Sequence, residues 1–426
     1  MTSPKTRIMS GMAAHLYSQI ITVVAQLVSL PIYLSRWNTD QYGRWLMISA
    51  IPAYLAISDV GILTAAGNLM SMHQARRETA EVNRVFHSSL AAMLVLLPSL
   101  ALCATVLLLS FSFGLDRDQH GALYALVLTG LLHMASGLFD AIYRSFGKYP
   151  RGTFLLTSFR ILDYCGMFAG VFIGGTLTSA ALGYLASRVI ASVVMFALAR
   201  RDVPLVRWNW WDADLGLIRR LLRSGIGFLS FPFGSLLILQ GLVVLVGAQL
   251  GGSAVALFNS IRTLTRLLTQ LSLTAAKAMS PEISALFGAG REAEAIQLSN
   301  QVLWRVVLFT ALGALVLAPL GPTILQHWSR GKIRFDGTIY AYLLAAAVAA
   351  AYWQIQAVRL TATNRHSLLA TIFLLSSAAA LLIAYVTEPR FGVGAAAAAT
   401  CFVDFAMIIG TTTALRRAEA ANHART

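Results

Sequence analysis

The stretch Met1–Trp37, MTSPKTRIMSGMAAHLYSQIITVVAQLVSLPIYLSRW, places two basic residues ahead of a long apolar run. The run is about 25 residues long, whereas the apolar region of a secretory signal has about 7 to 15 residues and ends at a small-residue cleavage site. No convincing cleavage site follows it. The stretch therefore predicts a first transmembrane helix and not a cleaved signal.

Apolar runs of this kind recur along the whole chain of 426 residues, which is 57% hydrophobic and 12% charged, with a mean hydropathy of +0.68. An average soluble domain is about 25% charged, and an apolar run of roughly 18 residues can span a bilayer. The composition thus predicts an all-α polytopic membrane protein. Windows of about 19 residues predict twelve spans, at 10–34, 42–66, 86–112, 121–146, 153–175, 178–199, 226–249, 253–277, 301–326, 338–362, 366–386 and 392–414.

The basic residues between the predicted spans favour one face of the membrane, and this bias predicts orientation because cytoplasmic loops are enriched in Lys and Arg. The opposite face has few, apart from a short loop with Arg330, Lys332 and Arg334, which either contacts lipid headgroups or attracts an anionic substrate. Both termini are therefore expected to be cytoplasmic. The enriched face holds Lys5, Arg7, Arg76, Arg77, Arg84, Arg144, Lys148, Arg151, Arg200, Arg201, Arg207, Arg219, Arg220, Arg223, Arg416, Arg417 and Arg425.

A weak internal repeat at an offset near 214 divides the chain into two halves. SMHQARRETAEVNRVF (71–86) aligns with ALFGAGREAEAIQLSN (285–300), so that Arg77 matches Arg291 and Glu78 matches Glu292. Repeats of this kind are typical of duplicated transporter halves. We expect two pseudo-symmetric six-helix lobes around a central cavity. Their predicted limits are 1–200 for the N-terminal lobe, 201–225 for a cytoplasmic linker, 226–414 for the C-terminal lobe and 415–426 for a cytoplasmic tail.

The linker is too polar to span the membrane. Leu215, Ile218 and Leu222 recur at helical spacing, with a cluster of arginines on the other side and tryptophans just before. This pattern is typical of a helix that lies in the membrane interface. Anchoring and regulation are both compatible with it.

Two arginines four residues apart, Arg262 and Arg266, lie in the predicted span 253–277, within NSIRTLTRLLTQ (259–270). Arg262 is roughly 14 Å into the span at 1.5 Å per residue, so snorkelling to a surface is hard. The spacing places both on one helical face. They either pair with buried carboxylates such as Asp59 or Asp163, or line a hydrated cavity that receives an anionic ligand.

Two further arginines lie within predicted spans. Arg160 and Asp163, at i and i+3, are expected to neutralise each other, which leaves Arg188 without an obvious partner. Because intramembrane charges usually face a bundle interior or a cavity, Arg188 and Arg160 join the candidate cationic cavity residues.

Other titratable residues in spans admit two interpretations. Asp59, Asp163 and Asp404 are either proton or sodium coupling sites or structural hydrogen-bonding groups, and His15 either titrates near neutral pH or bonds across the bundle. No cysteine pair has metal-ligand spacing. No metal or organic cofactor is therefore expected, and a coupling ion, proton or sodium, is left open.

Other function classes fit poorly. The net charge of +15 is spread over short loops without an aromatic–basic platform, which argues against nucleic acid. No phosphate-binding loop of the Walker type is present. The triplet Asp116–Asp118, DRD, resembles a glycosyltransferase carboxylate pair but has no catalytic domain around it. An enzyme is not expected, and transport is what the pattern favours.

Several stretches together resemble Wzx-type polysaccharide flippases of the multidrug/oligosaccharidyl-lipid/polysaccharide exporter superfamily. They are DQYGRW (40–45), YLAISDVGI (54–62) and VALFNSIRTLTRLLTQLSLTAAKAMSPEISALFGAGREAEAI (255–296). The resemblance in layout covers nearly the whole chain.

The resemblance implies a two-lobed transporter of a bacterial inner membrane that flips an undecaprenyl-diphosphate-linked oligosaccharide to the outer leaflet by alternating access. It also implies a cationic lumen, which Arg262 and Arg266 match in kind, and a pathway shared with a polysaccharide polymerase and glycosyltransferases. Two alternatives stay open. One is a MATE-like exporter of small amphipathic compounds with acidic coupling residues, and the other is a membrane scaffold in a polysaccharide-assembly complex.

Overall fold

The computed structural model describes residues 4–55, 61–110, 114–226, 230–363 and 366–423. Every regular element within these ranges is helical, as the composition predicts. The chain forms two compact units. The first comprises Met1–Trp37 and Ile48–Leu229, and the second comprises Asn38–Met47 and Ser230–Thr426.

Ten helices in the described ranges are long and apolar enough to cross a membrane, and each coincides with a predicted span. The two other predicted spans do not meet these criteria. The span 42–66 is divided between α2 (Thr39–Leu55) and α3 (Ile62–Ala75), with residues 56–60 outside the described ranges. The span 253–277 lies in one continuous helix, α11 (Gly252–Gly288), whose polar side chains lower its hydropathy. The total of twelve spans stays a prediction.

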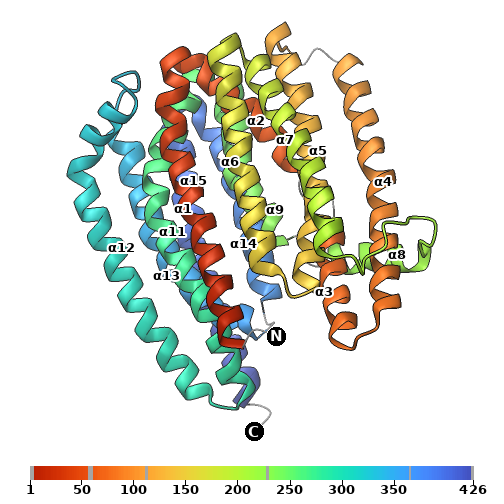
Figure 1. Cartoon of the computed structure of the whole chain (residues 1–426). Coiled ribbons are helices and arrows are strands. Elements are labelled where there is room, and N and C mark those ends of the chain that lie inside the picture. The colour runs from red at the N-terminus through yellow and green to blue at the C-terminus, as the bar shows by residue number, and fades with distance from the viewer. Residues whose placement is uncertain (1–3, 56–60, 111–113, 227–229, 364–365, 424–426) are drawn as a thin grey trace. The chain divides into compact units, whose positions relative to one another are not determined.

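The first unit is a helical bundle whose longest connection is the loop 203–214 before α8 (Figure 1). Besides α3 and the second part of α2, its helices are α1 (Pro4–Arg36), α4 (Thr79–Ser110), α5 (Arg117–Ser145), α6 (Tyr149–Gly174), α7 (Leu177–Asp202) and α8 (Leu215–Ile226). The DRD triplet has a structural role here. Asp116 caps α5, and both carboxylate oxygens of Asp118 accept backbone N–H bonds of 2.8 Å from the start of α7.

The close approach of α6 and α7 depends on glycines spaced four apart. A Cβ atom built on Gly166 would lie 2.4 Å from the carbonyl oxygen of Gly183, and one built on Gly170 would lie 2.1 Å from that of Ser179. Small residues at this spacing let membrane helices touch along their backbones, because apolar association in lipid relies on close packing. This contact fixes α7 against α6.

Replacement of Gly170 by alanine should therefore destabilise the first unit, because the new Cβ meets a backbone oxygen that cannot rotate away. We expect a loss of about 2 kcal/mol or more, at the upper end of the range for overpacked sites. Thermal unfolding of the purified protein in detergent measures it. Gly394→Ala is the matched control, since a Cβ at that position has no neighbour within 4 Å; equal melting temperatures for the two variants would contradict the prediction.

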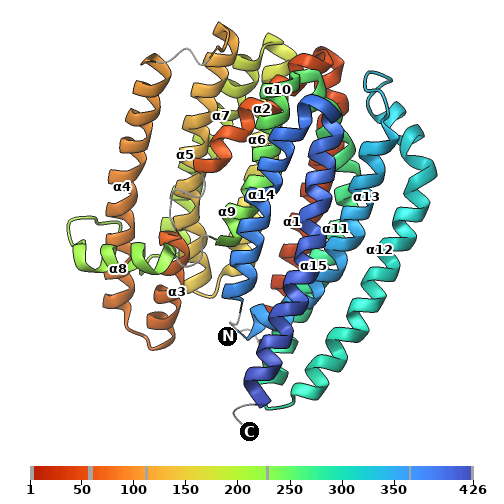
Figure 2. The same ribbon diagram turned by 180° about the vertical axis from the view of Figure 1, so that it is seen from behind.

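The linker helix α8 runs crosswise to α4 and contacts α3 and α4 (Figures 1 and 2). Its helical structure was predicted, and one of its faces packs on the first unit. Leu217 and Leu221 are buried in the core of the first unit, whereas Leu215 is 81% and Leu222 37% exposed. The exposed leucines are compatible with an interfacial position, which stays a prediction.

Asp214 holds the start of α8 in place. Its carboxylate accepts N–H bonds from Gly216 at 2.7 Å and from Leu217 at 3.2 Å, and pairs with Arg84 of α4 at 2.7 Å. The N–H of Leu217, followed by Arg84, lowers the pKa of Asp214 below its usual value. The ionised carboxylate thus joins the linker to α4.

The docking of α8 should be pH-dependent in a defined direction. The pKa of Asp214 is lowered in the folded protein. Its contribution to the stability of the docked helix is therefore complete above the unfolded-state pKa of about 3.9, and it is lost as the pH falls through the lower folded-state pKa. Hydrogen exchange of α8, corrected for intrinsic rates, should accelerate only below about pH 4. The variant Asp214→Asn should lose this acid-induced acceleration of exchange, and Asp212→Asn should retain it. If the acceleration at low pH persists in Asp214→Asn, another titrating group causes it.

The second unit contains a segment from the beginning of the chain. Its other helices are α9 (Ser230–Leu236), a π-helical turn η1 (Leu237–Gly241), α10 (Leu242–Leu250), α11, α12 (Glu292–Trp328), α13 (Gly337–Ala362), α14 (Ser367–Phe391) and α15 (Val393–His423). Figures 1 and 2 show α11, α12 and α13 side by side. The early segment, Asn38–Met47, comprises Asn38 and the start of α2, and it packs on the start of α11.

This packing is a backbone contact. A Cβ built on Gly43 would lie 1.7 Å from the carbonyl oxygen of Gly252, and the Tyr42 side chain, 5% exposed, hydrogen-bonds Asn259. Sequence reasoning had placed the whole of 1–200 in the N-terminal lobe. The helix α2 instead carries residues of both units.

The repeat seen in the sequence is reflected in the positions of two turns. The α3–α4 turn contains Arg77 and the α11–α12 turn contains Arg291, and the offset of 214 places the start of α4 within one residue of the start of α12. The turns therefore occupy equivalent places in the two halves.

Candidate substrate cavity

One face of α11 is polar along four turns. Arg262, Arg266, Thr269 and Lys277 recur at helical spacing and line a cavity of about 510 Å³ within the second unit. The other walls come from α9, η1, α13, α14 and α15. Ligand pockets commonly have volumes of about 300 to 1,000 Å³, so this cavity is large enough for a charged headgroup.

Arg262 is held by the protein. Its side chain donates hydrogen bonds to Asn259 at 2.9 Å and to the carbonyl oxygen of Ile238 at 3.4 Å, and its guanidinium carbon lies 4.9 Å from the ring centroid of Phe258. The acceptor Ile238 belongs to η1, and a π-helical turn shifts the register of helical hydrogen bonds. The residue is only 6% exposed. Arg262 therefore combines a structural role with its place on the cavity wall.

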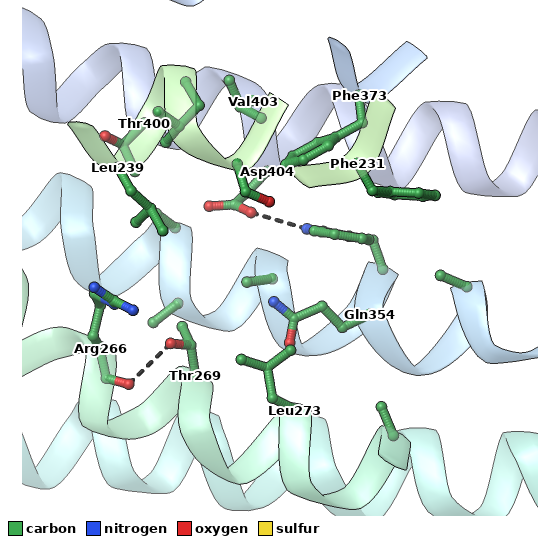
Figure 3. A pocket seen from close by; sticks show the side chains of 18 of the residues that line it. Phe231, Leu239, Arg266, Thr269, Leu273, Gln354, Phe373, Thr400, Val403 and Asp404 are labelled. Carbon is green, nitrogen blue, oxygen red and sulfur yellow. Dashed lines mark hydrogen bonds between the residues drawn. The ribbon is translucent and has the colours of Figure 1, made fainter. Parts of the chain in front are cut away.

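Arg266 has a different environment. Its guanidinium makes no hydrogen bond or ion pair with any residue that the structure describes, and Figure 3 shows the side chain on the wall of the cavity, one turn from Thr269. The Thr269 hydroxyl donates to the backbone oxygen of Arg266 at 2.9 Å. A cation that is half-buried and unpaired within the described structure is available to an anionic ligand.

Lys277 extends the cationic wall and was missed by sequence reasoning. It lies eleven residues after Arg266, about three helical turns, and so returns to the same face. The signal was present, because 262, 266, 269, 273 and 277 share one face of a helix. The predicted span ends at 277, so that hydropathy alone assigns the lysine to a helix terminus. Arg262, Arg266 and Lys277 thus form a row of cations that extends roughly 22 Å along the helix axis.

The opposite wall is formed mainly by α13 and α15. Alanines of α13 supply a small apolar surface, and Asp404 of α15 accepts a hydrogen bond of 2.9 Å from the indole of Trp353. Figure 3 shows Gln354 and Asp404 facing α11 across the cavity. The predicted carboxylate Asp404 is thus a cavity residue, while its coupling role stays a prediction.

The pairing predicted within α6 was wrong. The buried carboxylate of Asp163 forms an ion pair with Arg188, and Arg160 donates a hydrogen bond of 3.1 Å to the hydroxyl of Thr22. The glycine contact of α6 with α7 brings Arg188 beside Asp163, an effect of tertiary packing that spacing along one helix does not reveal. Arg188 is therefore a paired structural residue. Asp163 is engaged in the first unit, which removes it as the proposed partner of Arg262 and Arg266.

Two predicted residues cannot be placed. Asp59 lies outside the described residues, as does the side chain of His15. The described part of the chain contains no group of three or more His, Cys, Asp or Glu residues that could hold a metal ion. Among the predicted site residues, Arg262, Arg266 and Asp404 line the cavity.

Comparisons with solved structures identify the fold. An inward-facing MATE multidrug transporter of the MOP superfamily matches with a TM-score of 0.68 at 16% identity, over 94% of this chain and 99% of that one. The lipid II flippase MurJ in an inward closed conformation matches with a TM-score of 0.67 at 12% identity, over 95% and 87%. A MOP superfamily transporter from Pyrococcus furiosus matches with a TM-score of 0.64 at 16% identity, over 98% and 97%.

At these identities the structural matches show the fold alone. A search of curated proteins found no match. The pattern of one family, described as "Polysaccharide biosynthesis protein", matches residues 8–287, which is well over half of the sequence. The chain therefore belongs to the polysaccharide biosynthesis protein family and has the fold of the MOP-superfamily transporters.

Proposed function

We propose that the protein is a flippase that moves an undecaprenyl-diphosphate-linked oligosaccharide from the cytoplasmic to the outer leaflet of a bacterial inner membrane by alternating access. The observation that carries the proposal is the row of Arg262, Arg266 and Lys277 on the cavity wall of a helix with the length of a membrane span. Cell-surface polysaccharide synthesis supplies such a substrate.

The diphosphate headgroup is the part of this substrate that the bilayer core excludes. A diphosphate moved through a low-dielectric bilayer would lose its hydration at high cost unless fixed cations compensate its charge. The planar guanidinium group suits phosphate oxygens, and it stays charged at any physiological pH. A cavity with fixed cations on its wall can therefore admit a headgroup that the lipid core excludes, while the polyprenyl tail stays in the bilayer.

The comparisons support the same proposal. Family membership indicates polysaccharide biosynthesis, and the lipid II flippase MurJ has the same fold. The Pyrococcus furiosus transporter is described by a reversed polarity of its binding pocket that suggests a different function. In this chain the cavity wall on α11 is basic. The bias of basic loops favours cytoplasmic termini. A polysaccharide polymerase and glycosyltransferases are the expected partners in the pathway.

A second candidate is a cation-coupled exporter of small amphipathic compounds. It is favoured by Asp404, an acidic group beside aromatic rings in the same cavity, and by the MATE structures among the similar folds. The two candidates differ in the charge of the substrate, because the α11 cations attract an anion and repel a cation.

Export in cells tests the proposal. Deletion of the gene in its host should abolish one cell-surface polysaccharide and accumulate its lipid-linked precursor in the cytoplasmic leaflet, and the wild-type chain supplied in trans should restore export. Purified protein in liposomes should equilibrate that precursor between leaflets. Unchanged polysaccharide together with altered tolerance to cationic drugs would replace the flippase by the second candidate.

A further inference from the structure

The cavity has an aromatic end that the cationic row does not explain. Trp353, Phe373 and Phe231 come from three different helices, α13, α14 and α9. Their ring centroids lie 5.8 Å apart for the first pair and 5.7 Å for the second, with tilts of 37° and 33°. Three tilted rings in series form a curved apolar surface. In Figure 3 Phe231 lies on the opposite side of Gln354 and Asp404 from Arg266.

The polar groups between the rings and Arg266 are the amide of Gln354 and the carboxylate of Asp404. The side-chain oxygen of Gln354 is buried and has no hydrogen-bond partner within the described structure. One oxygen of Asp404 accepts from Trp353, and its other oxygen bonds to no described residue. A buried amide oxygen without a donor costs free energy. This part of the cavity therefore offers amide and carboxylate oxygens to a ligand that supplies hydrogen-bond donors.

Resting on the proposed function, we propose that Trp353, Gln354 and Asp404 bind the sugar ring attached to the diphosphate of the lipid-linked substrate. A pyranose has an apolar C–H face that packs on aromatic rings and hydroxyl groups that donate to carboxylate and amide oxygens. The ring next to the diphosphate is the one that reaches this place while the phosphates contact Arg266, because both groups line one cavity.

An amphipathic cation is the competing ligand, since aromatic rings and a carboxylate also attract cations. The composition of the same wall disfavours it. Arg262, Arg266 and Lys277 share the cavity with Asp404, so three positive side chains face one negative side chain. Within a low-dielectric site this excess repels a cation. Quaternary cations also lack the hydrogen-bond donors that the oxygens of Gln354 and Asp404 can accept.

Binding measurements on the full chain in nanodiscs test the proposal with three probes. They are undecaprenyl diphosphate, the undecaprenyl-diphosphate-linked saccharide extracted from the deletion strain, and tetraphenylphosphonium. The wild type should bind the saccharide-linked lipid more tightly than the sugar-free lipid. Gln354→Ala and Asp404→Asn should each weaken saccharide-lipid binding about tenfold more than sugar-free binding, the effect of one lost hydrogen bond to a ligand.

The controls separate this inference from the proposed function. Gln356→Ala removes the same side chain two residues further along α13, outside the cavity lining, and should leave the preference for saccharide unchanged. Arg266→Ala should weaken both lipids alike. An unaltered preference in Gln354→Ala and Asp404→Asn would overturn the sugar site while the flippase stands. Failure of the wild type to bind either lipid, with tetraphenylphosphonium bound through Asp404, would overturn both.

Discussion

Simultaneous replacement of Arg262 and Arg266 by alanine is expected to reduce polysaccharide export about 100-fold or more at matched membrane abundance. A hydrogen bond to a charged group is worth about 1.5 to 3 kcal/mol, so two lost contacts with a diphosphate correspond to a factor of at least about 100. The precursor should accumulate in the cytoplasmic leaflet. Quantitative surface-polysaccharide staining, together with accessibility of the precursor from each side, measures the effect.

The single variants distinguish binding from structure. Arg262 bonds Asn259 and Ile238, so Arg262→Ala should lower both export and thermal stability. Arg266 has no such contact in the described structure, so Arg266→Ala should lower export with an unchanged melting temperature. Arg305→Ala, an exposed arginine of α12 outside the cavity lining, is the matched control for loss of charge. Full export by the double variant would exclude these arginines from the mechanism.

Replacement of Arg188 by methionine is expected to destabilise the first unit by about 3 to 5 kcal/mol, because it leaves the carboxylate of Asp163 buried without its partner. Both side chains of the pair are only 4% exposed, so water cannot replace the lost guanidinium. Denaturant unfolding in detergent, followed by the fluorescence of the first unit's tryptophans, measures the loss.

The double variant Asp163→Leu, Arg188→Met tests the physical reason. Replacement of a buried ion pair by apolar residues is often neutral or stabilising, so the double variant should recover most of the lost stability. The exposed pair of Arg291 and Glu294 gives the comparison, with side chains 58% and 53% exposed. Arg291→Met should leave the stability almost unchanged, because water screens an exposed ion pair. A double variant as unstable as Arg188→Met alone would show that packing, and not unpaired charge, causes the loss.

Much of the fold follows from the sequence because hydropathy depends on local composition. Ten predicted spans coincide with helices, and the turns at Arg77 and Arg291 lie in equivalent places. The span 253–277 shows the limit of hydropathy windows. Arginines that line a cavity lower the mean hydropathy of a helix as much as arginines on a surface do. The start of α2 belongs with the second unit because of a backbone contact between two glycines, and such a contact leaves no periodicity in either segment.

The candidate site was predicted in part. Spacing alone places Arg262 and Arg266 on one face, and the structure places both on a cavity wall. The partner of Asp163 could not be predicted, because an ion pair between helices depends on their crossing and not on sequence distance. The aromatic end was missed for the same reason, since Trp353, Phe373 and Phe231 belong to three different helices and meet only in the folded unit.

The contact of Gly43 with Gly252 has a consequence for biosynthesis. The two glycines are separated by about 200 residues, so at roughly 5 to 20 residues per second the ribosome needs about 10 to 40 s to deliver the second after the first. Throughout that interval Asn259 of α11, the hydrogen-bond partner of Tyr42, has not been synthesised. The start of α2 therefore reaches its final packing late, after most of the first unit has been synthesised and inserted.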